Sequence, residues 1–318
     1  MVAEDPANTP ELIRHPQFYF PDGSIILKSE NIIYCVYASI LKTRSEFFQT
    51  LLSKPPPVQT HNAEHGAEEV SMDAPEKLQD GKTDDTAIEL APIHSASEFD
   101  HVLSFLFESW EHDNRTLEAL VAILKLSSFY LIDKGRAYSI RMLSTHPGLR
   151  PAHRLYLAQQ YRVCDWIKPA WEMLFSLPLT LLTHEDVHFL GLDAMETLAV
   201  TKEKIITHRR RLALNAPKVQ HSYFCRDNDA CTRAWSHAWW GEYDRAGVAR
   251  LLLQNRGLTR EEIVTRLNQM NVAGMDNQCR RFTLDALERA PMVAKLELEE
   301  CEKAQVIDAY EKALKDSL

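Results

Sequence analysis

Apolar and polar residues alternate along the first part of the chain with the period of two that is typical of β-strands. Phe18 and Phe20 follow this alternation, Asp22-Gly23 has the composition of a tight turn, and the apolar run 25–27 comes next. The pattern predicts a β-hairpin with the turn glycine at positive φ. Residues 32–37 predict another strand, and residues 88–93 predict a short one.

Elsewhere the apolar residues recur every three or four positions, which predicts helices. Ser45 is a candidate N-cap for a short helix that contains Phe47 and Phe48. Ser95 and Glu98 form a candidate capping box before another helix. From Thr116 onward the pattern is helical nearly to the end, first in two helices up to residue 145 and then near 152–163, 165–177, 184–210, 230–255, 259–270 and 283–316.

Proline and charge divide the chain. Pro-Gly at 147–148 and Pro151 predict a boundary between an α+β domain at 15–145 and an all-α helical domain at 151–318. Residues 54–87 open with three prolines, contain no aromatic residue and hold three bases against eight acids. We expect this segment to be a disordered acidic insert and residues 1–14 to be a disordered N-terminus.

Composition narrows the function classes. The 318 residues are 45% hydrophobic with ten glycines, which suits a folded and largely helical protein. The net charge of −9 is local, because the insert contributes −5 and the last helix −3. We expect no nucleic-acid partner because no binding module is visible, and no membrane span because the longest apolar stretch, 173–184, is too short. The six scattered cysteines suit a reduced compartment, cytoplasmic or nuclear.

Several segments carry a resemblance to a known family. FYFPDGSIIL (18–27), IYCVYASILKTRSEFF (33–48) and SEFDHVLSFLF (97–107) resemble, in this order, the BTB/POZ domain of the many BTB proteins of mushroom-forming fungi. LYLAQQYRVCDW (155–166) is similar to the helices that follow such domains. The family's usual Val-His pair is Val36-Tyr37 in this chain.

The resemblance implies a protein-interaction module rather than an enzyme. Such domains pair with themselves, act as adaptors that recruit a cullin scaffold for ubiquitin transfer, or oligomerise transcription regulators in the nucleus. The stretch 38–52 is rich in apolar residues for its length, so some of them are expected to face a partner, the alternative being that all line the core. The candidate partner-binding residues are Val36, Tyr37, Ile40, Leu41, Phe47, Phe48 and Leu51.

Residues 184–188 spell HExxH, the helical zinc motif of many metalloproteases. In this interpretation, His184 and His188 would bind zinc and Glu185 would act as the general base. A zinc-dependent hydrolase is therefore the remote alternative. We favour a structural interpretation, in which Thr183 is the N-cap of a helix and Asp186 completes a capping box. No catalytic residue, metal or cofactor is therefore expected.

A second group of candidate metal ligands surrounds Cys225 and Cys231. His221, Asp276 and Cys279 are candidates to complete a set of four. The five residues between the first two cysteines exceed the usual spacing of zinc ligand pairs, and the ligand set looks incomplete. The sequence therefore favours free thiols over a zinc site but leaves both open.

Three further features have a structural interpretation and a functional alternative. The basic run 208–211 is expected to be a solvated helix end, the alternatives being a nuclear-import signal or an acid-binding patch. The core is expected to hold the aromatic stripe Trp235, Trp239 and Trp240 with Tyr243. The alternative is an aromatic docking surface on which Trp240, off the 235/239 face, is exposed for binding. The acidic last helix, 293–318, is expected to dock on the domain with its charges in water.

Overall fold

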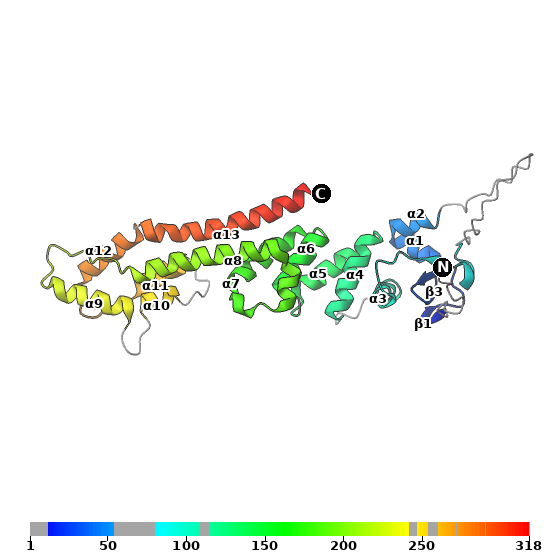
Figure 1. Cartoon of the computed structure of the whole chain (residues 1–318), viewed down its shortest axis with the longest axis horizontal. Coiled ribbons are helices and arrows are strands. Elements are labelled where there is room, and N and C mark those ends of the chain that lie inside the picture. The colour runs from blue at the N-terminus through cyan, green and yellow to red at the C-terminus, as the bar shows by residue number, and fades with distance from the viewer. Residues whose placement is uncertain are drawn as a thin grey trace, which may run out of the picture. The chain divides into compact units, whose positions relative to one another are not determined.

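The computed structural model describes residues 12–53, 80–108, 115–241, 247–253, 260–270, 272–289 and 291–317. The chain divides into two compact units, Met1–Leu149 and Arg150–Leu318 (Figure 1). The first unit combines a small sheet with helices, and the described part of the second unit contains helices without strands. The fold is therefore α+β in the first unit and all-α in the second.

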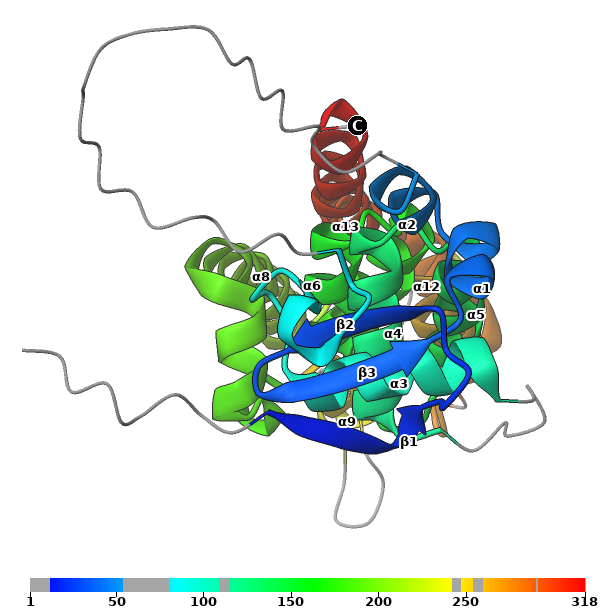
Figure 2. The ribbon, with the colours of Figure 1, turned by 90° about the vertical axis from the view of Figure 1, so that its right-hand side faces the viewer.

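The sheet of the first unit has four strands in the order β1-β3-β2-β4. The strands are β1 (Ile13–Tyr19), β2 (Ile25–Ser29), β3 (Ile32–Val36) and β4 (Ile88–Glu89). β3 pairs antiparallel with β2 and parallel with β1, and β2 pairs parallel with β4. Figure 2 shows β1, β3 and β2 side by side, with the helices α3 (Ala96–Phe107) and α4 (Leu117–Phe129) behind them.

The predicted hairpin over residues 17–27 is wrong in its pairing. The chain does reverse after Phe20, but β3 lies between the two strands that the turn connects. Gly23 does not have a positive φ, and a glycine is needed there for a steric reason. A Cβ at this position would lie 2.5 Å from Cys35 Sγ and 2.9 Å from the Cys35 carbonyl carbon. The antiparallel pair is β2–β3, and Glu30 adopts a φ of 56° in the turn that joins them.

Both faces of the sheet are covered. Alternation places Leu27 and Tyr34 on one face, where the Tyr34 ring meets Phe99 of a helix edge-on at 5.2 Å. Ile26, Cys35 and Ala87 form a smaller cluster on the opposite face. Ala87 belongs to the end of the segment that was expected to be a disordered insert.

Part of the predicted disorder is wrong. Residues 54–79 and 1–11 lie outside the described residues, whereas 80–87 and 12–14 are ordered. A 3₁₀ turn, η1 (Asp84–Thr86), follows a capping box at Thr83, and Arg14 donates to Asp84 at 2.6 Å. Residues 80–87 are ordered because this short stretch covers an apolar sheet face and its Asp84 accepts hydrogen bonds from β1.

Two helices of the first unit begin at the caps that the sequence predicts. Ser45 accepts a hydrogen bond from the Phe48 amide, and Ser95 and Glu98 form a complete capping box. The expected helix over 38–52 is split at Ser45, whose backbone is extended. The helices are α1 (Ala38–Arg44), α2 (Glu46–Leu51), α3 (Ala96–Phe107), α4 (Leu117–Phe129) and α5 (Asp133–Thr145).

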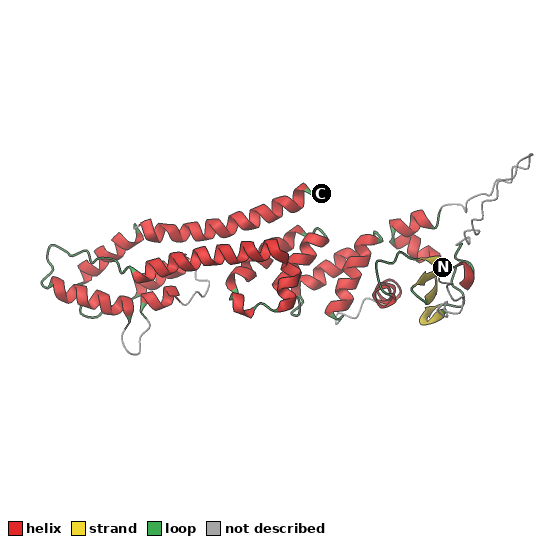
Figure 3. Cartoon of the chain, in the orientation of Figure 1, coloured by secondary structure: helices red, strands yellow, loops and turns green. Residues whose placement is uncertain are grey.

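Helices build the described part of the second unit (Figure 3). They are α6 (Pro151–Gln160), η2 (Cys164–Trp166), α7 (Ile167–Ser176), η3 (Leu179–Leu181), α8 (His184–Leu214), α9 (Asn228–Trp240), α10 (Val248–Leu253), α11 (Arg260–Gln269), α12 (Asn277–Glu288) and α13 (Pro291–Asp316). The expected stretch 230–255 is interrupted at Gly241, which has a φ of 87°. No helix among the described residues is long and apolar enough to cross a membrane.

Two of the three tryptophans of α9 lie in the core as expected, and the third does not. Tyr243 lies outside the described residues. Trp235 and Trp239 are buried, and their indole nitrogens each donate to a backbone carbonyl at 2.9 Å, those of Pro217 and Ala213. Trp240 lies off this face and exposes 47% of its surface. The buried pair belongs to a core cluster that also contains Cys231 and Cys279.

Candidate functional site

The candidate partner-binding residues of the first unit fall into two groups. Val36, Leu41 and Phe48 have no exposed surface, so they line the core instead of facing a partner as proposed. Leu41 and Phe48 are buried because the break at Ser45 turns α1 and α2 so that each directs one apolar residue inward. Val36 is the last residue of the buried strand β3. Partial exposure is left to Tyr37, Ile40, Phe47 and Leu51.

An exposed apolar patch extends from two of these residues to the end of α4. Phe47 and Leu51 lie one turn apart on α2, and the Phe47 ring is 6.0 Å from that of Phe129. Phe129 is 41% exposed, and Leu131, two residues further on, is 50% exposed. We call Phe47, Leu51, Phe129 and Leu131 the α2–α4 patch.

The sheet edges offer little to a partner strand. Pro16 removes a backbone donor from β1, and the register of β1 shifts between Arg14 and Tyr19. The other edge, β4, is two residues long. Short, proline-containing and irregular edges resist pairing with another strand, so side chains are the better means of association for this unit.

The HExxH segment is a helix N-terminus. Thr183 and Asp186 form the predicted capping box of α8, and Asp186 is buried. Arg150 donates to its carboxylate from Nε at 2.7 Å, which holds the pKa of Asp186 below its usual value. His184 and His188 are exposed, and they belong to no group of three or more metal-ligating side chains within the described ranges.

The basic run is only partly solvated, contrary to expectation. Glu299 of α13 is buried and accepts from Arg209 Nε at 3.0 Å, with His208 Nδ1 2.8 Å from its other oxygen. Arg210 and Arg211 are exposed. The run therefore joins two helices, and one charge of α13 that was expected in water lies in this junction.

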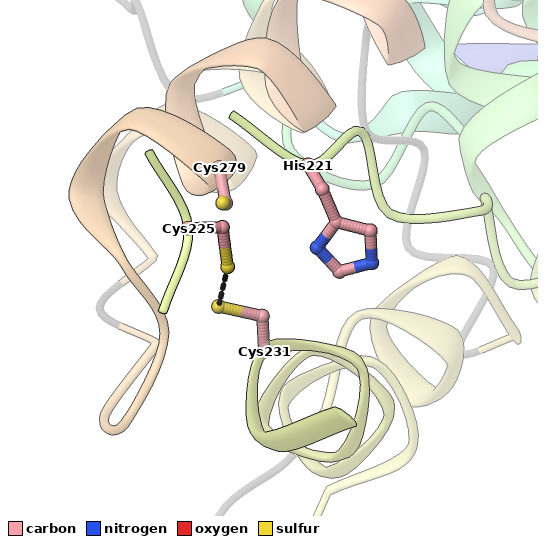
Figure 4. Close-up of side chains that lie close together, drawn as sticks. All are labelled: His221, Cys225, Cys231 and Cys279. Atoms are coloured by element: carbon pink, nitrogen blue, oxygen red, sulfur yellow. Dashed lines mark hydrogen bonds between the residues drawn. The ribbon is translucent and has the colours of Figure 1, made fainter. Parts of the chain in front are cut away.

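The fold brings four candidate metal ligands together. Figure 4 shows them converging: His221 and Cys225 from the loop between α8 and α9, Cys231 from the first turns of α9, and Cys279 from the first turn of α12. One ligand atom from each side chain lies within 4.8 Å of every other. The ligand set that looked incomplete in sequence thus contains four members in space.

Two capped helices position the buried cysteines. Asp227 accepts from the Ala230 amide at the start of α9, and Asp276 accepts from the Gln278 and Cys279 amides at the start of α12. The Asp276 carboxylate is therefore occupied as a cap, and Asp276 is not among the four clustered side chains. Its backbone amide instead donates to Cys231 Sγ at 3.3 Å.

The thiols crowd one another. Cys225 Sγ lies 3.6 Å from Cys231 Sγ, and all three cysteines are free. Burial, together with hydrogen bonds to Cys279 and Cys231, raises the pKa of Cys225 to about 11. The Cys225 side chain is therefore a neutral thiol near pH 7 in the absence of a cation.

Sequence reasoning missed one surface feature of the same loop. Tyr223 and Phe224, between His221 and Cys225, are 95% and 76% exposed, and their rings meet edge-on at 5.3 Å. The sequence could have indicated this feature, because the two adjacent aromatic residues lie between two potential ligands and outside any helical pattern of apolar residues.

Comparison with known proteins adds no identity: no family model, curated protein or solved structure matches the chain.

Proposed function

We propose that this chain is a non-enzymatic interaction scaffold that self-associates through its first unit and offers its helical unit to another protein. In this proposal the first unit is a BTB/POZ domain of the kind found in mushroom-forming fungi. The chain acts in the cytoplasm or nucleus as an adaptor, with a cullin-type ubiquitin ligase as one partner. The observation that carries the proposal is the α2–α4 patch.

The patch has the chemistry of a protein interface. Aromatic and large aliphatic side chains dominate the binding energy of most interfaces, and the patch holds two phenylalanines and two leucines. Phe129 and Leu131 remain exposed although every other large apolar residue near them in sequence, from Leu120 to Ile132, is at least partly buried. Two copies that bury this patch would remove apolar surface from water at about 25 cal/mol per Å².

The test is the mass of the full chain in solution at micromolar concentration, measured by light scattering. We expect a dimer for the natural chain and a monomer for Phe129→Glu, because a charge at an aromatic anchor costs about 2 kcal/mol or more, roughly 30-fold in affinity. The matched control is Leu192→Glu in the second unit, where the leucine is 81% exposed. A monomeric natural chain, or a Phe129→Glu variant that stays dimeric, would contradict the proposal.

The adaptor role needs a separate measurement. A purified cullin is expected to bind to the full chain when the two are incubated together. If Phe129→Glu also binds the cullin, binding does not require the dimer, and if the variant does not bind it, the dimer is required. The nuclear-regulator alternative gains no support from the basic run, since Arg209 is buried against Glu299.

A further inference from the structure

We propose that His221, Cys225, Cys231 and Cys279 bind one Zn²⁺ ion in a closed, structural site of the second unit. Zinc in structural sites takes four tetrahedral nitrogen and sulfur ligands, and three cysteines with one histidine is one of its common sets. The cluster supplies this set from the loop, α9 and α12 (Figure 4). The role is independent of the proposed interaction function.

The distances fit a metal better than a disulfide. Two sulfurs bound to one zinc at about 2.3 Å in a tetrahedron lie about 3.8 Å apart. The Cys225 and Cys231 sulfurs are 3.6 Å apart, whereas a disulfide requires about 2.05 Å. The largest separation in the cluster, at most 4.8 Å, closes with small side-chain movements.

The surroundings stabilise sulfur in its thiolate form. The Ser222 amide donates to Cys279 Sγ at 3.2 Å, and the Asp276 amide donates to Cys231 Sγ at 3.3 Å. Both cysteines also sit at the positive ends of capped helices, which favour negative charge. Amide donors around ligand sulfurs are the outer contacts that orient and tune a metal site.

His221 is oriented as a ligand. Its Nδ1 is buried and has no hydrogen-bond partner within the described part of the chain, an unfavourable state for a polar atom. Its Nε2 lies 3.4 Å from Thr232 Oγ1, and the ring turns its other nitrogen toward the sulfurs (Figure 4). A metal bonded to Nδ1 satisfies this atom, while Thr232 holds the far side of the ring.

The ligand chemistry selects the ion and its role. Thiolate and imidazole ligands favour zinc over magnesium and calcium, which prefer oxygen. Four protein ligands leave no position for a substrate or water, so the site is structural. Binding releases up to three thiol protons to the buffer and links the loop after α8 to the starts of α9 and α12, across 58 residues of chain from His221 to Cys279.

The experiment measures metal content of the full chain, purified with a histidine-free tag and a phosphine reductant, by mass spectrometry of the elements. We expect about one zinc per natural chain. We expect at least a fivefold lower content in Cys225→Ser, whose side chain is only partly buried, and in Cys279→Ser. The matched controls are Cys301→Ser, an exposed cysteine of α13, and His188→Ala in the HExxH segment, both expected to keep the metal.

A variant that conserves the ligand chemistry guards against misfolding. His221→Cys is expected to retain zinc because four cysteines also form a tetrahedral site, whereas His221→Ala is expected to lose it. Cobalt substituted into the natural chain should give the absorption bands of tetrahedral thiolate coordination, and Cys225→Ser should weaken them. Absence of zinc from the reduced natural chain, a Cys225–Cys231 disulfide in its place, or zinc that is lost with His188 and kept without Cys225 would overturn the proposal.

Discussion

His94 is a buried histidine whose environment favours its neutral form. Its Nε2 lies 2.6 Å from Tyr130 Oη, its Nδ1 lies 3.2 Å from the Ser95 carbonyl oxygen, and its ring stacks on Phe99 at 5.5 Å. Burial lowers the pKa of His94, and the nearby charge of Lys125 lowers it further, against the opposing effects of the Ser95 carbonyl, Glu98 and Glu30. Folding therefore disfavours protonation at this position.

This residue should make the first unit sensitive to mild acid. The unfolded chain takes up a proton at His94 near pH 6.5, and the folded chain does so only at lower pH. Above about pH 6.5 His94 is neutral in both states and does not change the free energy of unfolding. As the pH falls from there toward the lower pKa of His94 in the folded chain, the free energy of unfolding decreases. We expect His94→Gln to lose less stability between pH 7 and 5 than the natural chain does, measured by urea unfolding of the full chain.

The control for this measurement is His188→Gln, which replaces an exposed histidine of the second unit. It should follow the natural chain across the same pH range. Equal losses for His94→Gln and the natural chain would show that protonation of His94 does not govern acid sensitivity.

Among the elements, those defined by neighbouring residues could be predicted from the sequence, and those defined by distant contacts could not. The caps at Ser45, Ser95 and Thr183 each need only residues within four positions, and all three are confirmed. The partner of β1 is β3, set by packing across the sheet, and the predicted hairpin missed it. Cys279 joins the His221 cluster for the same non-local reason, so local spacing made the ligand set look incomplete.

A buried carboxylate of α13 takes part in the contact between α8 and α13. Glu299 is 4% exposed, and Arg209 is 3% exposed. The Glu299 carboxylate forms ion pairs with Arg209 and His208. A second contact, further along α13, places the Tyr310 ring 4.9 Å from that of Trp171 on α7. This polar contact sets the position of α13 along α8, because a carboxylate in the interior needs its charged partner at hydrogen-bond distance.

Glu299→Ala is expected to destabilise the second unit by about 3–5 kcal/mol, since it removes the carboxylate from a buried guanidinium. Hydrogen exchange of the full chain should then accelerate over residues 299–316. The matched control is the neighbouring Glu300→Ala, which removes an exposed pair with Lys303 and should cost about 0–1 kcal/mol. Equal effects of the two substitutions would contradict a special role for Glu299.

At the scale of the whole molecule, each unit has an interior of its own. In the first unit, Gly135 lets α5 approach α4 so closely that a Cβ would lie 2.3 Å from Ser127 Oγ and 3.2 Å from Phe105. In the second unit, Trp235, Trp239 and the cysteine cluster share one core. Because the chain divides into two compact units, we predict that stability is a property of each unit.

Two substitutions, one in each unit, test this independence. Gly135→Val forces branched carbons against Ser127 and Phe105 and should cost the first unit about 1–3 kcal/mol. Its effect on hydrogen exchange should be confined to residues before 150, as that of Glu299→Ala should be to residues after it. If the units unfold independently, the two losses in the double variant should add to within about 0.5 kcal/mol. A larger deviation, or loss of protection in the unit that carries no substitution, would mean that the chain unfolds as one cooperative body, and the two cores would then have to be energetically coupled.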